Sequence, residues 1–83
     1  MKTWQCHKKV KAFKIGGVEL DDTGWNGHVL VPEDPTVDPV FVSVEYFIKH
    51  NPKAGGYYVR YEGGYESWSP ADAFESGYTE LPE

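Results

Sequence analysis

The stretch Gly55–Glu80, GGYYVRYEGGYESWSPADAFESGYTE, decides the fold of this 83-residue chain. Residues alternate in character from Tyr57 to Tyr61, which predicts a β-strand, and Gly63-Gly64 predicts a reversal of the chain. Ser69-Pro70 predicts a short helix with the serine as N-cap and the proline in the first helical position. Gly77 predicts the end of that helix through a left-handed C′ residue.

The loop at Gly63-Gly64 sets the register of the predicted hairpin. A two-residue loop pairs Glu62 with Tyr65, Arg60 with Ser67 and Val59 with Trp68. Because side chains alternate across a strand, this register sorts the residues of the hairpin onto two opposite faces. The core face then holds Tyr57, Val59, Tyr61 and Trp68, and the solvent face holds Tyr58, Arg60, Tyr65 and Ser67. A loop of another length would change the partners on the second strand.

Further strands are predicted on both sides of this stretch. They cover residues 8–15, 18–20, 28–31 and a brief segment from residue 40, with a last short strand at 78–81. In the first of these, Val10 and Ala12 face away from Phe13 and Ile15, so either a bulge near Ala12 or an edge strand covered on both faces is required. Gly16-Gly17 predicts an interruption of this strand.

A second helix is predicted near residues 44–50. Ser43 fits its N-cap, the spacing of Val44, Phe47 and Ile48 predicts one buried stripe, and Asn51-Pro52 predicts its end. With the helix near 70–76, the sequence predicts a single α+β domain over residues 1–83. Its core is a small twisted antiparallel β-sheet, with a partly open barrel as an alternative form.

The charge of the chain is divided unevenly. Residues 1–18 carry a charge of +5 and the remainder −10, for a net charge of −5. An acidic chain is poorly suited to nucleic acid, which requires cations to displace counterions from phosphates. The lysine-rich beginning fits a solvated strand face, or docking on the acidic remainder or on an acidic partner. Without a signal peptide or a long apolar run, we expect a cytoplasmic protein that does not enter membranes.

No catalytic chemistry is indicated by the sequence. Cys6 is the sole cysteine, so no intramolecular disulfide or Cys-based metal site can form. His7, His28 and His50 lack metal-ligand spacing, and no phosphate loop, Ser-His-Asp signature or dinucleotide motif is present. We therefore expect no catalytic residue, no metal and no cofactor, and a protein that acts by binding.

A binding site is predicted from aromatic rings, one forked cation and neutral hydrogen-bonding groups. Such a set suits a nucleotide-type small ligand or a host protein. The predicted ligand-binding residues are Trp25, Asn26, His28, Tyr58, Arg60, Tyr65, Ser67 and Trp68. Three alternatives stay open: Trp25-Asn26 belongs only to a turn, Arg60 pairs with Glu62 or Glu66, and Trp68 fills the core.

The ending YYVRYEGGYESWSPADAFESGYTEL, with KKVKAFKI near the start, resembles small uncharacterised proteins of tailed phages and prophages. Trp25-Asn26-Gly27, Trp68-Ser69 and Asp72 are similar, in that order, to phage Thoeris anti-defence sponges, which bind cyclic ADP-ribose-type signals as homo-oligomers. This resemblance implies a phage-encoded homo-oligomer in the host cytoplasm that sequesters a nucleotide-derived signal. The alternatives are an inhibitor that blocks a host defence enzyme by direct contact and a virion assembly accessory.

Overall fold

The structure is a computed structural model that describes residues 1–5, 9–20 and 27–81. Within these ranges, seven strands pair antiparallel in one sheet that stays open and does not close into a barrel. The predicted α+β class with an antiparallel sheet and two short helices is confirmed. The elements are β1 (Lys2–Gln5), β2 (Lys9–Leu20), β3 (His28–Pro32), β4 (Val40–Val42), α1 (Val44–His50), β5 (Tyr57–Tyr61), β6 (Glu66–Ser69), α2 (Ala71–Gly77) and β7 (Thr79–Glu80).

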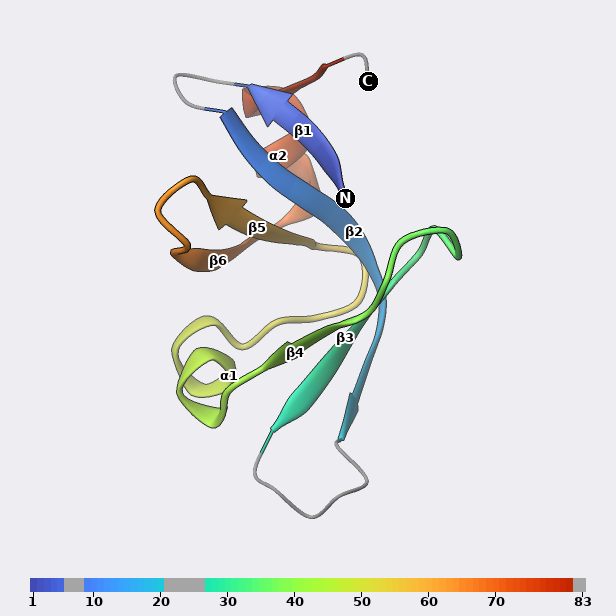
Figure 1. The fold of residues 1–83 in the computed structure, drawn as a ribbon, viewed down its shortest axis with the longest axis vertical. Coiled ribbons are helices and arrows are strands. Elements are labelled where there is room, and N and C mark those ends of the chain that lie inside the picture. The colour runs from blue at the N-terminus through green and yellow to red at the C-terminus, as the bar shows by residue number, and fades with distance from the viewer. Residues whose placement is uncertain (6–8, 21–26, 82–83) are drawn as a thin grey trace.

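Strand β2 organises the sheet because its two halves have different neighbours. Its first half pairs with β1 and β5, and its second half pairs with β3. β7, β6 and β4 then extend the sheet from β1, β5 and β3. Figure 1 shows the result, with α2, β1, β5 and β6 around one half of β2 and α1, β3 and β4 around the other.

The predicted interruption at Gly16-Gly17 is wrong, because β2 runs through both glycines. The irregularity lies between Ile15 and Gly17 in the pairing with β3, not near Ala12. A Cβ on Gly16 would lie 3.1 Å from Cα of Glu33, so the missing side chain permits this close approach of two backbone segments. Residues 2–5 form the strand β1, which was not predicted and which pairs antiparallel with the first half of β2.

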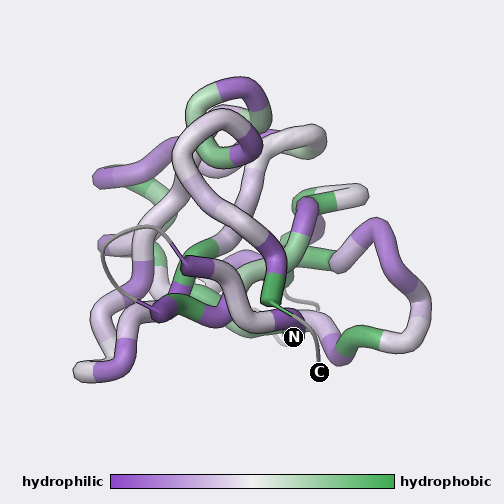
Figure 2. The backbone as a smooth tube through the Cα atoms, turned by 90° about the horizontal axis from the view of Figure 1, so that it is seen from above, coloured by the Kyte–Doolittle hydropathy of each residue, from purple (hydrophilic) through white to green (hydrophobic). Residues whose placement is uncertain are grey.

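Two hydrophobic clusters lie on opposite faces of the sheet. Since successive residues of β2 and β5 point to opposite faces, each strand contributes to both. This explains the phase change within β2, which is a central strand with both faces covered. One cluster holds Phe13, Ile15, Leu30, Val42, Tyr46 and Tyr58, and the other holds Val10, Ala12, Tyr57, Val59 and Phe74. Figure 2 shows hydrophobic and hydrophilic positions interspersed along the backbone, as this alternation requires.

The predicted register of the β5–β6 hairpin is wrong by one residue. The N–H of Tyr61 donates to the carbonyl of Tyr65, and Gly64 adopts a φ of 89°, so the loop has a third residue in the left-handed region. Tyr58 therefore pairs with Trp68, and the two share a face. The predicted solvent position of Tyr58 is wrong, because this side chain is fully buried.

Helix α1 begins and ends as predicted but buries a different residue. The Ser43 hydroxyl accepts a hydrogen bond from the N–H of Tyr46, and Asn51 ends the helix with a φ of 45°. Tyr46 is the buried residue because its hydroxyl donates to the Ser67 carbonyl at 2.7 Å, which ties the helix to β6. The predicted stripe is wrong, as Ile48 is 76% exposed.

Helix α2 is fixed by ring packing rather than by the predicted caps. Pro70, not Ser69, occupies the N-cap without a side-chain hydrogen bond. Gly77 is the last helical residue without a positive φ, and Tyr78 follows in an extended conformation. Phe74 is fully buried, with its ring stacked 4.2 Å from Tyr57 and 4.5 Å from Tyr78. This stacking holds the short helix on the sheet.

Candidate functional site

The predicted site residues do not form one pocket among the described residues. Trp25 and Asn26 lie outside the described residues, and with them the alternative that they belong only to a turn. His28 belongs to the half of the sheet built from β3 and β4, where its ring stacks on Phe47 at 3.7 Å. The remaining predicted residues lie on the β5–β6 hairpin in the other half, or at its tip.

On the hairpin, Tyr58 connects the core to the surface. Its ring is buried, its hydroxyl donates to the Glu66 carboxylate, and the same hydroxyl accepts a hydrogen bond from Nε of Arg60 at 3.1 Å. Burial and then the bond to Glu66 raise the pKa of Tyr58 to about 12. Arg60 is therefore linked to Glu66 through a tyrosine hydroxyl, which answers the question of its partner left open by the sequence.

The other hairpin residues are engaged within the chain. Trp68 packs against the cluster around Tyr58, and a Cβ on Gly56 would overlap its indole ring. The Ser67 carbonyl accepts the hydrogen bond from α1. Tyr65 is half exposed, and its hydroxyl accepts a hydrogen bond from Nζ of Lys49 at 3.2 Å. Of the alternatives left open for Trp68, packing against the core is therefore the one that the structure has.

A basic sheet face lies beside this hairpin, formed by Thr3, Lys9, Lys11 and Arg60. Lys11 is directly opposite Thr3 on β1 and directly opposite Arg60 on β5, and Lys9 lies two residues along the same strand. These side chains therefore share one face. They line a cleft of about 430 Å³ formed by Thr3, Lys9, Val10, Lys11, Arg60, Tyr61 and Glu62.

This face was only partly predictable from the sequence. The lysine-rich beginning suggested a solvated strand face or a docking surface. What the sequence did not provide was the pairing of β2 with β5, which places Arg60 opposite Lys11. The two residues are far apart in the chain, so only the strand order of the sheet brings the three cations together.

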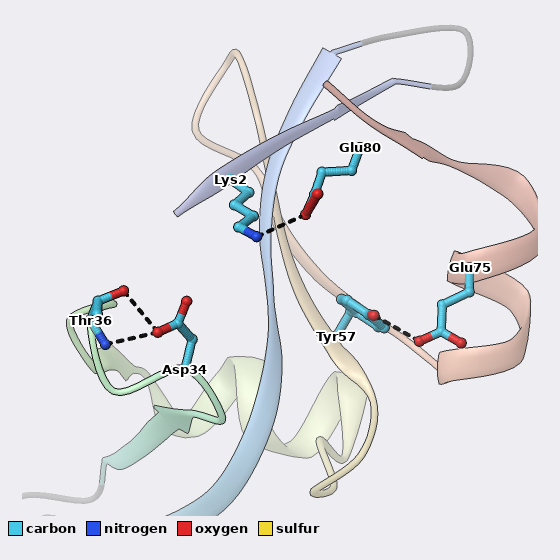
Figure 3. A network of polar contacts seen from close by, with 6 residues as sticks. All are labelled: Lys2, Asp34, Thr36, Tyr57, Glu75 and Glu80. Carbon is cyan, nitrogen blue, oxygen red and sulfur yellow. Dashed lines mark hydrogen bonds and ion pairs between the residues drawn. The ribbon is translucent and has the colours of Figure 1, made fainter. Parts of the chain in front are cut away.

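A second cleft, of about 290 Å³, differs because polar groups around it are paired within the chain (Figure 3). It is lined by Lys2, Trp4, Ala12, Phe13, Lys14, Glu33, Asp34, Val37, Tyr57 and Glu80. Lys2 pairs with Glu80 at 3.1 Å, Tyr57 donates to Glu75 at 2.8 Å, and the N–H of Thr36 donates to Asp34 at 2.9 Å. This last bond lowers the pKa of Asp34.

Residues 1–5, 9–20 and 27–81 contain neither a metal-binding cluster nor a membrane-spanning helix. In these ranges no three His, Cys, Asp or Glu side chains gather in a way that would hold a metal ion. Neither of the two helices in them has the length and apolar character needed to cross a bilayer.

Comparison with known proteins gives one informative likeness. No family model matches the chain, and no curated protein matches it. The NMR solution structure of the monomeric form of the phage L decoration protein is similar in fold, with a TM-score of 0.63 and 22% identity over 92% of this chain. The chain spans 58% of that protein's length. At this identity the likeness establishes a shared fold, and it gives no link to anti-defence sponges.

Proposed function

We propose that this chain is a non-enzymatic accessory protein of a phage particle that attaches to the outside of the capsid. The observation that carries the proposal is the fold that it shares with the phage L decoration protein over 92% of its length. The resemblance of its two ends to small proteins of tailed phages points the same way. Because the match covers only 58% of the decoration protein, the proposal concerns attachment through the shared fold alone.

The arrangement of the aromatic residues supports surface attachment over capture of a nucleotide-derived signal. A nucleotide pocket needs exposed rings on which a base can stack. Tyr58 is fully buried, and Trp68 packs against the same hydrophobic cluster. The Tyr58 ring is therefore closed to a small ligand, and the Trp68 ring is partly covered by its packing on the cluster. Tyr65 keeps a half-exposed ring, but the exposed lysines of the neighbouring basic sheet face suit a macromolecular surface better than a base.

Cosedimentation with particles tests the proposal. Particles of the encoding phage would be prepared from a mutant that lacks this gene, mixed with the purified chain and pelleted. We expect saturable recovery of the chain with the particles, and none with particles of an unrelated tailed phage. Retention of the chain in the supernatant at every particle concentration would contradict the proposal. Calorimetry with cyclic ADP-ribose, run beside it, would support a sponge instead if it showed saturable heat.

A further inference from the structure

The four lysines of residues 1–18 that the structure describes fall into two groups. Lys2 is 3.1 Å from Glu80 and Lys14 is 3.9 Å from Glu75, so both have carboxylate partners. Lys9 and Lys11 are exposed, and no carboxylate of the described residues lies within ion-pair distance of either. Of these lysines, the two without a carboxylate partner therefore both lie on the basic sheet face.

The pairing of Lys11 with Arg60 adds to this concentration of charge. The two residues are directly opposite each other on β2 and β5. Like charges in that position destabilise a sheet, so the folded chain tolerates an unfavourable pair at its surface. A negatively charged partner that bound across both side chains would relieve the repulsion, and the gain would appear as binding free energy.

The orientation of the Arg60 side chain is fixed before such a partner binds. Its Nε is fixed by the hydroxyl of the buried Tyr58 at 3.1 Å. This bond uses one donor of the guanidinium, and the described contacts leave the two Nη groups without a protein partner. A guanidinium fork matches the two oxygens of a carboxylate. Fixing its orientation beforehand lowers the entropy lost on binding.

The surroundings of this face favour protein carboxylates over nucleic acid. Glu62 lines the same cleft, and Glu66 is directly opposite Arg60 in the strand register of the hairpin. The whole chain carries a net charge of −5. The net negative charge repels any anionic partner, but duplex binding depends in addition on many phosphate contacts, which three cations do not supply. A folded protein presents a few carboxylates at defined positions, which three clustered cations are able to match.

We infer that the basic sheet face, formed by Thr3, Lys9, Lys11 and Arg60, is the surface through which this chain binds a carboxylate-rich protein surface. This inference rests on the proposed function, and within it the face is the side turned toward the capsid. The exposed lysines on the central strand β2 provide attraction that salt screens, and Arg60 on the neighbouring strand β5 provides the directional contact.

The inference is tested by NMR titration of the ¹⁵N-labelled chain with poly-L-glutamate, in parallel with a short DNA duplex. We expect amide shifts at Thr3, Lys9, Lys11 and Arg60 with the polypeptide, and weaker binding of the duplex. The double variant Lys9→Gln/Lys11→Gln should bind poly-L-glutamate about tenfold more weakly. The matched control, Lys49→Gln/Lys53→Gln, removes the same charge elsewhere and should bind as the wild type does.

Three results would overturn the inference: no shifts on the basic sheet face, equal weakening in both double variants, or tighter binding of the duplex than of poly-L-glutamate. The same variants in the particle assay separate this inference from the proposed function. Particle binding that is unchanged by Lys9→Gln/Lys11→Gln would refute the face and leave the function standing. Failure of the wild-type chain to bind particles would refute the function, and the titration would still decide the face.

Discussion

Tyr57 and Tyr58 are neighbours on β5 with similar chemistry and opposite surroundings. Both side chains are buried, and each hydroxyl donates to a glutamate, Tyr57 to Glu75 and Tyr58 to Glu66. On the Tyr57 side, the carboxylate lies 3.9 Å from Lys14 under α2. On the Tyr58 side, the same hydroxyl also accepts a hydrogen bond from Nε of Arg60, and the described contacts leave the two Nη groups of Arg60 without a protein partner.

The comparison shows how one local arrangement serves two purposes. A buried tyrosine with a carboxylate partner satisfies its polar group in either place. On the Tyr57 side, the nearby cation Lys14 has a carboxylate partner within the chain, so the arrangement contributes to stability only. On the Tyr58 side, Arg60 keeps hydrogen-bond donors without a protein partner, so we expect this arrangement to take part in binding. Changes on the Tyr57 side should therefore alter stability, and changes on the Tyr58 side should alter binding as well.

The largest expected effect is on the Tyr57 side. Phe74→Ala should lower the free energy of unfolding by about 3–5 kcal/mol, because it empties a fully buried site between stacked rings. Urea denaturation measures it. The control Ile48→Ala, at a 76% exposed position of α1, should change stability by less than about 0.5 kcal/mol. A large loss in the control would show that α1 buries the stripe that includes Ile48 after all.

Removing the two hydroxyls separately tests the comparison itself. Tyr58→Phe should cost about 1–3 kcal/mol, because it strips Glu66 and Arg60 of a part-buried partner. Tyr57→Phe should cost about 1 kcal/mol, since Glu75 is exposed and can be solvated. Only Tyr58→Phe should weaken binding to poly-L-glutamate. Equal binding by the two variants would mean that Arg60 does not depend on Tyr58 for its orientation.

The hairpin loop gives a smaller effect that tests the register. Gly64→Ala should destabilise the chain by about 1 kcal/mol, because Gly64 has a φ of 89°. Gly63→Ala, at a residue without a positive φ, should be close to neutral. Thermal unfolding compares them. The opposite order would favour a loop of different geometry, and with it a different partner for Tyr58.

Changing the pH should have no effect through these tyrosines near neutrality. Burial, followed by the bond to the partner glutamate, raises the pKa of Tyr57 and of Tyr58 to about 12 from the ordinary value of 10. Both groups are protonated in folded and unfolded chains below pH 10, so their stabilisation is complete there. It is lost as the pH rises from 10 toward 12. Absorbance at 295 nm, followed with unfolding, measures it, and phenolate absorbance below pH 10 from these residues would contradict it.

Local features of the fold were predictable from the sequence, and long-range ones were not. The Ser43 cap and the end of α1 at Asn51 depend on neighbouring residues, and both are confirmed. The hairpin register was missed because Gly63-Gly64 fits a two-residue or a three-residue loop. The burial of Tyr46 was missed because its partner, the Ser67 carbonyl, lies on a distant strand.

The candidate site was predictable only in part, for the same reason. Composition drew attention to Arg60 and the aromatic residues. Tyr58 lies on the face opposite Tyr57 and Val59 as predicted, but that face is covered by a second hydrophobic cluster, and the one-residue register error hid that Trp68 shares it. The basic sheet face depends on β1, β2 and β5 lying side by side, which no local pattern specifies. Its lysines were visible in the sequence, but their position opposite Arg60 was not.

The most direct test of the central claim is electron cryomicroscopy of the encoding phage, with and without this gene. The account predicts additional density on the outside of the capsid in the presence of the gene, of a size that fits a body of 37 × 25 × 23 Å. The basic sheet face, with Lys9, Lys11 and Arg60, should point toward carboxylates of the capsid. Identical maps from the two particles, with the chain present in the infected cell, would contradict it.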